Sequence, residues 1–71
     1  MEMILNMAVK YNKLFSLLKE RKLKSREFLQ QAKISGNVLT RMKRDEYISM
    51  ESIEKICKML NCNVDDILEF Y

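Results

Sequence analysis

SGNVLTRMKR, residues 35–44, forms two faces of opposite character when it is laid on a helix, and the rest of the chain can be understood around it. At 3.6 residues per turn, one narrow face is apolar and carries Val38, Leu39 and Met42. The other face carries hydrogen-bonding side chains at i, i+3, i+4 and i+7, which are Asn37, Thr40, Arg41 and Arg44. The pattern predicts a short helix that buries one side and presents the other.

The polar face consists of side chains that match the edges of DNA bases. Asn pairs with N6 and N7 of adenine, Arg forks onto O6 and N7 of guanine, and Thr donates, accepts or touches a thymine methyl. Lys43 and Arg44 follow where such a helix would leave a duplex, and a cation there can neutralise phosphate. A solvated helix face explains the same residues, because polar faces with two or three cations are common.

Length and composition predict one small helical domain. The chain has 71 residues with one Gly and no Pro, whereas sheets and long loops need these residues as punctuation, so we expect an all-α bundle. We place the domain at residues 10–71. Residues 1–9 alternate weakly in hydropathy and are too short to fold alone. They are a tail, a strand that pairs with a second chain, or an extension upstream of a start at Met7.

Charge is divided unevenly along the chain. Residues 1–44 carry 11 Lys or Arg against 3 Asp or Glu, a balance of +8. Residues 45–71 carry 2 against 7, a balance of −5, so the net charge of +3 hides a basic front and an acidic back. Such a field orients a protein on a polyanion and keeps its far side away from it.

Several functional classes are disfavoured by the residue types. The chain has no His, and Cys57 and Cys62 alone cannot complete a tetrahedral zinc site, so we expect no metal and no cofactor. Free cysteines favour the reducing cytoplasm. No Gly-rich phosphate loop or catalytic cluster indicates an enzyme, and no small-molecule ligand is expected. No apolar run approaches the ~18 residues of a membrane span, and the start lacks the basic lead of a signal peptide.

Two short helices are predicted around a tight connection. A first helix over residues 10–21 buries Tyr11, Leu14, Phe15 and Leu18. The next runs over residues 25–32, with Ser25 as its cap and free N–H groups that suit a phosphate. Only Lys33-Ile34-Ser35 separates it from the helix of residues 35–44, for which Ser35 is the expected cap. Helices joined so tightly must cross steeply, as in a helix-turn-helix.

The acidic back predicts two more helices. One is capped by Ser49, buries Ile53, Ile56, Cys57 and Leu60, and stops at a left-handed Asn61. A last helix opens at Asn63 with two aspartates in its first turn, and Val64, Ile67 and Leu68 close the core. Phe70 and Tyr71 then end the chain as exposed aromatic surface.

From Leu14 to Leu68 the sequence resembles the lambda repressor and Cro-like helix-turn-helix family, particularly its small stand-alone bacterial members. The matching segments are LKSREFLQQAKISGNVLTRMKR, SMESIEKICKMLNC and NVDDIL. The resemblance implies a five-helix lambda-repressor-like domain whose second and third helices form the motif, with the third in the major groove. The chain departs from the family at Leu29, where a small residue is usual, and at Lys33, where Gly is usual.

The resemblance and the residues together predict a sequence-specific, double-stranded DNA-binding regulator of transcription. The expected base-reading residues are Gly36, Asn37, Thr40 and Arg41. The expected phosphate-binding residues are Lys24, Ser25, Arg26, Ser35, Lys43 and Arg44. A module of this size reads few base pairs, so we expect a homodimer. The alternative is a protein-interaction module that keeps this fold without binding DNA specifically.

Overall fold

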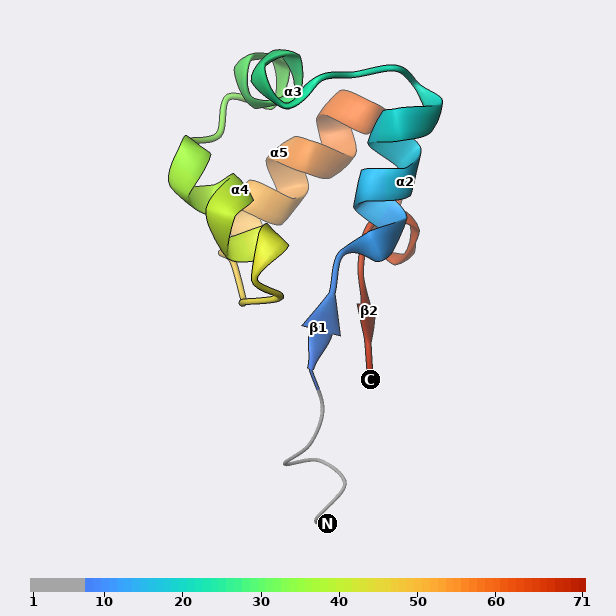
Figure 1. The fold of residues 1–71 in the computed structure, drawn as a ribbon, viewed down its shortest axis with the longest axis vertical. Helices are drawn as coiled ribbons and strands as arrows, with labels where there is room; N and C mark the ends of the chain where they lie inside the picture. The colour runs from blue at the N-terminus through green and yellow to red at the C-terminus, as the bar shows by residue number, and fades with distance from the viewer. Residues whose placement is uncertain (1–7) are drawn as a thin grey trace, which may run out of the picture.

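Four α-helices carry most of the part of the chain that the computed structural model describes, residues 8–71 (Figure 1). They are α2 (Asn12–Glu20), α3 (Ser25–Ala32), α4 (Gly36–Lys43) and α5 (Met50–Leu60). Figure 1 shows α5 in the middle of the molecule, with α2 on one side of it, α4 on the other and α3 across one end. Among residues 8–71, no helix has the length and hydropathy that crossing a membrane requires.

The apolar stripes of the helices meet in one core, as their spacing predicted. Each helix contributes two or three buried side chains, spaced three or four residues apart. The largest fully buried side chains are Tyr11, Phe28, Leu14, Met42, Ile56, Leu60 and Ile67. Phe15 and Cys57 pack against this core while staying partly exposed. The core therefore fixes how α3 and α4 sit on α5.

The predicted fifth helix is wrong. Its place is taken by η1, a single 3-10 turn at Val64–Asp66, in which the Asn63 N–H donates to Asp66 Oδ2 at 3.0 Å. Val64 is 40% exposed instead of buried, whereas Ile67 is buried as expected. The helix cannot continue beyond Ile67 because the chain becomes extended there and forms a strand.

Two short strands join the ends of the described chain. β1 (Val9–Lys10) pairs antiparallel with β2 (Glu69–Phe70), and Val9 lies opposite Phe70. Ala8 and Tyr71 extend the pair through two backbone hydrogen bonds of 2.9 and 2.8 Å. This pairing takes Lys10 out of the first helix, which begins at Asn12 and not at residue 10 as predicted. This two-stranded sheet differs from the all-α bundle that the composition predicted. Residues 1–7 of the expected tail or dimer strand lie outside the described residues.

The four helices end in left-handed backbone without the help of glycine. Positive φ angles near 58° or 54° occur at Lys22, Lys33, Asp45 and Asn61, one after each helix. The stop predicted at Asn61 is confirmed, with a φ of 54°. The cap predicted at Ser49 is also confirmed, because its hydroxyl accepts the Ser52 N–H at 3.1 Å. The single Gly36 has no positive φ.

Candidate DNA-binding surface

The turn between α3 and α4 sets the direction of α4. Lys33 adopts the left-handed region, with φ 58° and ψ 44°, and its N–H donates to the carbonyl of Leu29. The Ile34 N–H donates to the same carbonyl at 3.2 Å, and the Ile34 side chain packs against the core. In Figure 1, α3 is seen end-on while α4 runs across the view, so the two helices cross steeply, as predicted.

The fold accommodates both departures from the family pattern, Lys33 in the turn and Leu29 within α3. Lys33 takes a conformation that costs a residue with a Cβ on the order of 1 kcal/mol. The turn therefore keeps its shape at the expense of some stability. Leu29 belongs to α3, where it is partly buried and packs against the core.

The apolar side of α4 anchors it and leaves the polar side exposed. Leu39 and Met42 are buried, and Val38 packs partly against the core. The opposite side carries the four residues predicted to read bases, all of them exposed: Gly36, Asn37, Thr40 and Arg41. We call these four residues the reading face.

The residues of the reading face differ in how far the protein already engages them. The Thr40 hydroxyl donates to the Gly36 carbonyl at 3.1 Å, so it can still accept a hydrogen bond or offer its methyl group, but its proton is used. Arg41 forms no ion pair with any of residues 8–71. A Cβ placed on Gly36 would meet nothing within 4 Å, so the packing of the protein does not explain why this residue is glycine.

Ser35 stands at the N-cap position of α4, but its side chain does not cap. Its backbone is extended, with φ −84° and ψ 162°, and its carbonyl accepts the Val38 N–H at 3.1 Å. The prediction of a side-chain cap is wrong, because the Ser35 hydroxyl makes no capping hydrogen bond. The exposed hydroxyl stays available for another acceptor or donor.

Ser25 is not a cap either, because α3 begins one residue earlier than a Ser25 cap would require. Lys24 occupies the N-cap position, and its N–H donates to Oε1 of Glu27 at 3.1 Å. Glu27 can do this because it lies three residues beyond the cap. Lys24, Ser25 and Arg26 are all exposed, as phosphate contact would require. The Glu27 carboxylate lies beside them and lowers the positive potential at this end of α3.

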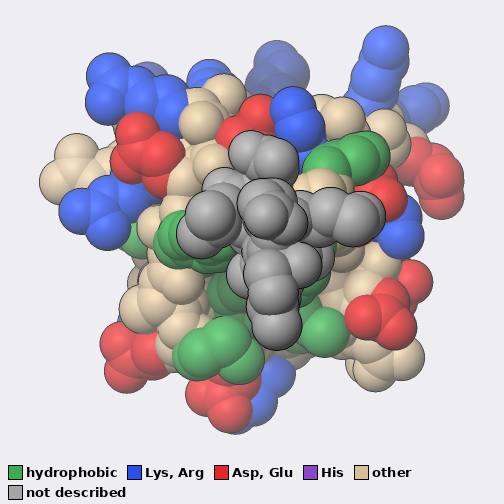
Figure 2. Space-filling view, turned by 90° about the horizontal axis from the view of Figure 1, so that it is seen from below, with side chains coloured by type: hydrophobic (Ala, Val, Ile, Leu, Met, Phe, Trp, Pro, Cys, Tyr) green, Lys and Arg blue, Asp and Glu red, His purple; other side chains and the backbone are tan. Residues whose placement is uncertain are grey.

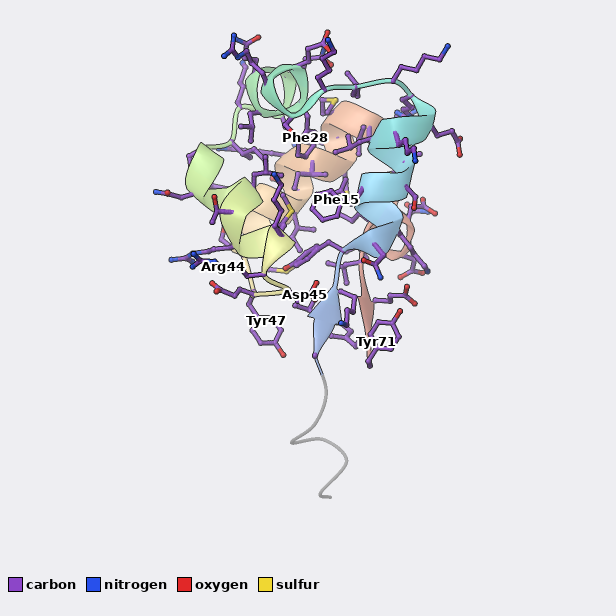
Figure 3. The ribbon with its side chains drawn as sticks, viewed as in Figure 1. Phe15, Phe28, Arg44, Asp45, Tyr47 and Tyr71 are labelled. Carbon is purple, nitrogen blue, oxygen red and sulfur yellow. The ribbon has the colours of Figure 1, made fainter. Side chains whose placement is uncertain are left out.

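The C-terminal end of α4 carries two further exposed cations. Lys43 is in the last turn of the helix and Arg44 follows it, pointing away from the body of the molecule in Figure 3. Arg44 Nη1 lies 4.0 Å from Glu46 Oε2, and both side chains are largely exposed, so this ion pair holds the guanidinium weakly. Over residues 24–44 the chain carries six Lys or Arg and a single acid, Glu27.

The segment after α4 is anchored by a residue that the sequence identified only as core. The hydroxyl of Tyr11, which is 1% exposed, donates to the carbonyl of Glu46 at 2.6 Å. Burial raises the pKa of Tyr11 above 10.0, and the nearby Asp45 raises it further. Lys10 Nζ also lies 3.3 Å from Asp45 Oδ2. No local sequence signal could show these contacts, because they join residues far apart in the chain.

Comparison with known proteins gives two matches. The family model for the Cro/C1-type HTH DNA-binding domain matches residues 13–71. Among solved structures, the crystal structure of the transcriptional regulator VanUg, form II, resembles this fold with a TM-score of 0.86. The two chains are 34% identical, and the alignment covers 92% of this chain and 87% of the other. A search of curated proteins found no match.

Proposed function

The chain belongs to the family of Cro/C1-type helix-turn-helix DNA-binding domains, and on that premise we propose that it regulates transcription by binding a specific double-stranded DNA sequence with α4 in the major groove. The observation that carries the proposal is the reading face. A helix fixed by Leu39 and Met42 exposes amide, hydroxyl and guanidinium groups side by side. These groups match the donor and acceptor pattern of base edges in the major groove.

The reading face and its flanks have different roles in this proposal. Asn37, Thr40 and Arg41 read base edges, and Gly36 lets the helix backbone come close to the duplex. The phosphate contacts come from the two ends of the motif, which carry Lys24, Ser25, Arg26, Ser35, Lys43 and Arg44. Phosphate contacts fix the register of the protein without carrying sequence information. The open space beside Gly36 supports its role, because neither packing nor backbone angle among residues 8–71 requires glycine there.

The protein acts as a homodimer in this proposal. One α4 covers only a few base pairs, so useful affinity needs a second copy on a half-site about 34 Å away. A two-fold dimer is the commonest arrangement of soluble homo-oligomers and matches a palindromic DNA site.

Paired alanine variants test the assignment of roles. Arg41→Ala should lower affinity for the specific site by about 1–3 kcal/mol and relax the preference at one base. Lys43→Ala should weaken binding to all DNA sequences alike and reduce the slope of log K against log salt by about one unit. The measurement is a gel shift at several salt concentrations, on the site found by footprinting DNA around the gene itself and on random DNA.

The two variants control for each other, since both remove one exposed cation from the same helix. If both lost affinity equally on specific and random DNA, Arg41 would not read a base. If the wild-type protein protected no DNA around its gene and bound random sequences equally well, the proposal of specific regulation would fail.

A further inference from the structure

Most of the large hydrophobic side chains that residues 8–71 expose gather at one place, the end of the molecule that holds the two strands. Tyr47 is 66% exposed, Met50 75%, Val64 40% and Phe70 55%. These four residues come from the segment before α5, the start of α5, η1 and β2, yet they line one groove. Figure 2 looks onto this end and shows several hydrophobic side chains at its surface, with acidic side chains beside them.

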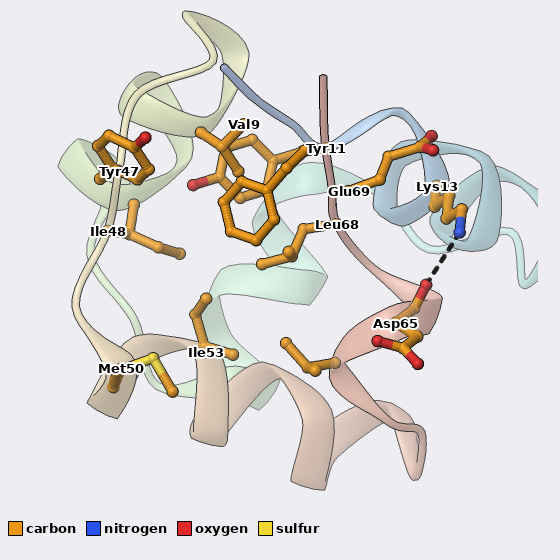
Figure 4. A pocket seen from close by; sticks show the side chains of 12 residues that line it. Val9, Tyr11, Lys13, Tyr47, Ile48, Met50, Ile53, Asp65, Leu68 and Glu69 are labelled. Atoms are coloured by element: carbon orange, nitrogen blue, oxygen red, sulfur yellow. Dashed lines mark hydrogen bonds between the residues drawn. The ribbon is translucent and has the colours of Figure 1, made fainter. Parts of the chain in front are cut away.

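This strand-end groove has a volume of about 680 Å³ and opens onto the core. We define it by Val9, Tyr11, Tyr47, Met50, Val64 and Phe70. Figure 4 shows Val9, Tyr11 and Tyr47 at one side of it and Met50 at the other. Val9 and Tyr11 are core residues, so an apolar group in the groove would extend the core of the domain. A monomer that leaves such a groove open exposes a contiguous apolar patch, and such patches mark interaction sites.

We infer that the strand-end groove is the surface through which two copies of this chain form the homodimer, with Tyr47 and Met50 of each copy packing into the groove of the other. This inference rests on the proposed function for its partner, because two half-sites require two copies. It is independent of which bases α4 reads.

Charge argues against nucleic acid as the occupant of the groove and in favour of a second copy. The groove is lined by Lys13 together with Asp65 and Glu69, and Lys13 Nζ donates to the Asp65 carbonyl at 3.2 Å (Figure 4). Two carboxylates against one cation repel a polyanion. A surface that carries both signs can match itself across a two-fold axis, since each residue then faces its symmetry-related partner residues.

The position of the groove fits a dimer that sets the spacing of the two α4 helices. Tyr47 lies three residues beyond Arg44, in the segment that leads from α4 to α5, and Figure 3 shows both residues at the same end of the molecule. The hydrogen bond from Tyr11 to the Glu46 carbonyl holds this segment in place before any partner binds. A copy docked here would be coupled to the end of α4 without covering the reading face.

The exposed aromatic side chains at this end of the molecule supply part of the area that a stable dimer buries. Tyr47, Phe70 and Tyr71 are 55–66% exposed, and with about 200 Å² per aromatic side chain they offer on the order of 350 Å². A standard interface buries about 800 Å² on each partner. Met50, which is 75% exposed, adds further apolar area at the rim of the groove.

Charged substitutions on the groove rim test the surface. Met50→Lys and, separately, Tyr47→Lys in the full chain should raise the dimer dissociation constant at least tenfold in sedimentation equilibrium. Ser16→Lys, which adds the same charge to an exposed position on α2, should leave it unchanged. Thermal melts of all three should match the wild type within a few degrees, because each site is exposed. Both rim variants should bind a single half-site normally and lose affinity for the paired site.

The outcomes separate this inference from the proposed function. Rim variants that stay dimeric, or a wild-type protein that stays monomeric both free and on paired half-sites, would overturn the surface. A wild-type dimer that the rim variants dissociate, but that binds no specific DNA, would support the surface and reject the function. Equal loss of dimerisation in Ser16→Lys would also overturn it, because the effect would then come from charge alone.

Discussion

The reading face of α4 and the strand-end groove differ in nearly every physical property although both depend on the same core. The reading face is polar and basic, and it belongs to one continuous helix of the chain. The groove is apolar with an acidic rim, and it is assembled from both ends of the described chain and the segment before α5. The difference matches the two roles proposed above, DNA binding for the reading face and contact with a second copy for the groove.

The two surfaces also differ in how strongly the protein holds them. Arg41 and the Ser35 hydroxyl have no partner among residues 8–71 in the contacts described above, so these groups keep their hydrogen-bonding capacity for a ligand. The groove is held in shape by the hydrogen bond of the buried Tyr11 hydroxyl, by the pairing of β1 with β2 and by the core residues beneath it. Under the proposed roles, side chains that read bases would be left free to adapt to them, whereas a dimer surface would benefit from being formed in advance.

The largest expected effect comes from removing the shared support. Phe28 of α3 is fully buried and points inward in Figure 3. The substitution Phe28→Ala should lower the free energy of unfolding by about 3–5 kcal/mol. That is most of the stability of a domain of this size. Thermal and urea melts should show a largely unfolded protein at 25 °C that has lost DNA binding and dimerisation together. Loss of only one activity in a folded protein would show that the surfaces do not share this core.

A smaller loss of stability is expected from removing the Tyr11 hydroxyl, which anchors the segment after α4. Tyr11→Phe removes the hydroxyl that donates to the Glu46 carbonyl and should cost about 0.5–1.5 kcal/mol. Because the folded state raises the pKa of Tyr11 above 10.0, its contribution is complete below pH 10 and is lost as the pH rises above it.

The pH dependence gives this prediction a matched control. The pKa of Tyr71 is also raised, mainly by its hydrogen bond to Glu69, so the wild type and Tyr11→Phe share that contribution. Urea melts between pH 8 and 11 should show the two proteins converging in stability above pH 10. A constant difference in stability across this range would mean that folding does not raise the pKa of Tyr11.

An effect of similar size and opposite sign is expected in the turn that sets the direction of α4. Lys33→Gly should raise the unfolding free energy by about 1 kcal/mol, because glycine adopts the left-handed conformation without the strain of a Cβ. Asn61→Gly is the control, and it should gain only a few tenths of a kcal/mol because Asn tolerates this conformation better. Urea melts measure both. Equal gains at the two positions would show that the strain at Lys33 is not specific to its side chain.

The sequence predicted best those features that depend on residues close together in the chain. The stripes of α2 and α5, the Ser49 cap, the Asn61 stop and the steep crossing at Lys33 were all predicted, because each depends on residues a few positions apart. The caps expected at Ser25 and Ser35 were wrong. At the first of these, Glu27 completes the cap from one residue earlier, and at the second only the backbone takes part.

The predictions of a fifth helix and of no sheet were wrong for a different reason. The segment NVDDILEF contains no local pattern that predicts a strand. The turn η1 stops because Glu69 and Phe70 pair with Lys10 and Val9, near the opposite end of the described chain. The groove has the same origin, since Val9, Tyr47 and Phe70 come together only after folding.

The amino-acid sequence by itself determined the helices, their buried stripes and the exposed side chains of α4, because helical periodicity is a property of neighbouring residues. Only the tertiary structure decided that the chain ends pair as strands, that Tyr11 holds the segment after α4 and that the apolar surface collects in one groove. These features depend on contacts between distant residues, whose partners are chosen by packing and loop closure and not by any local pattern.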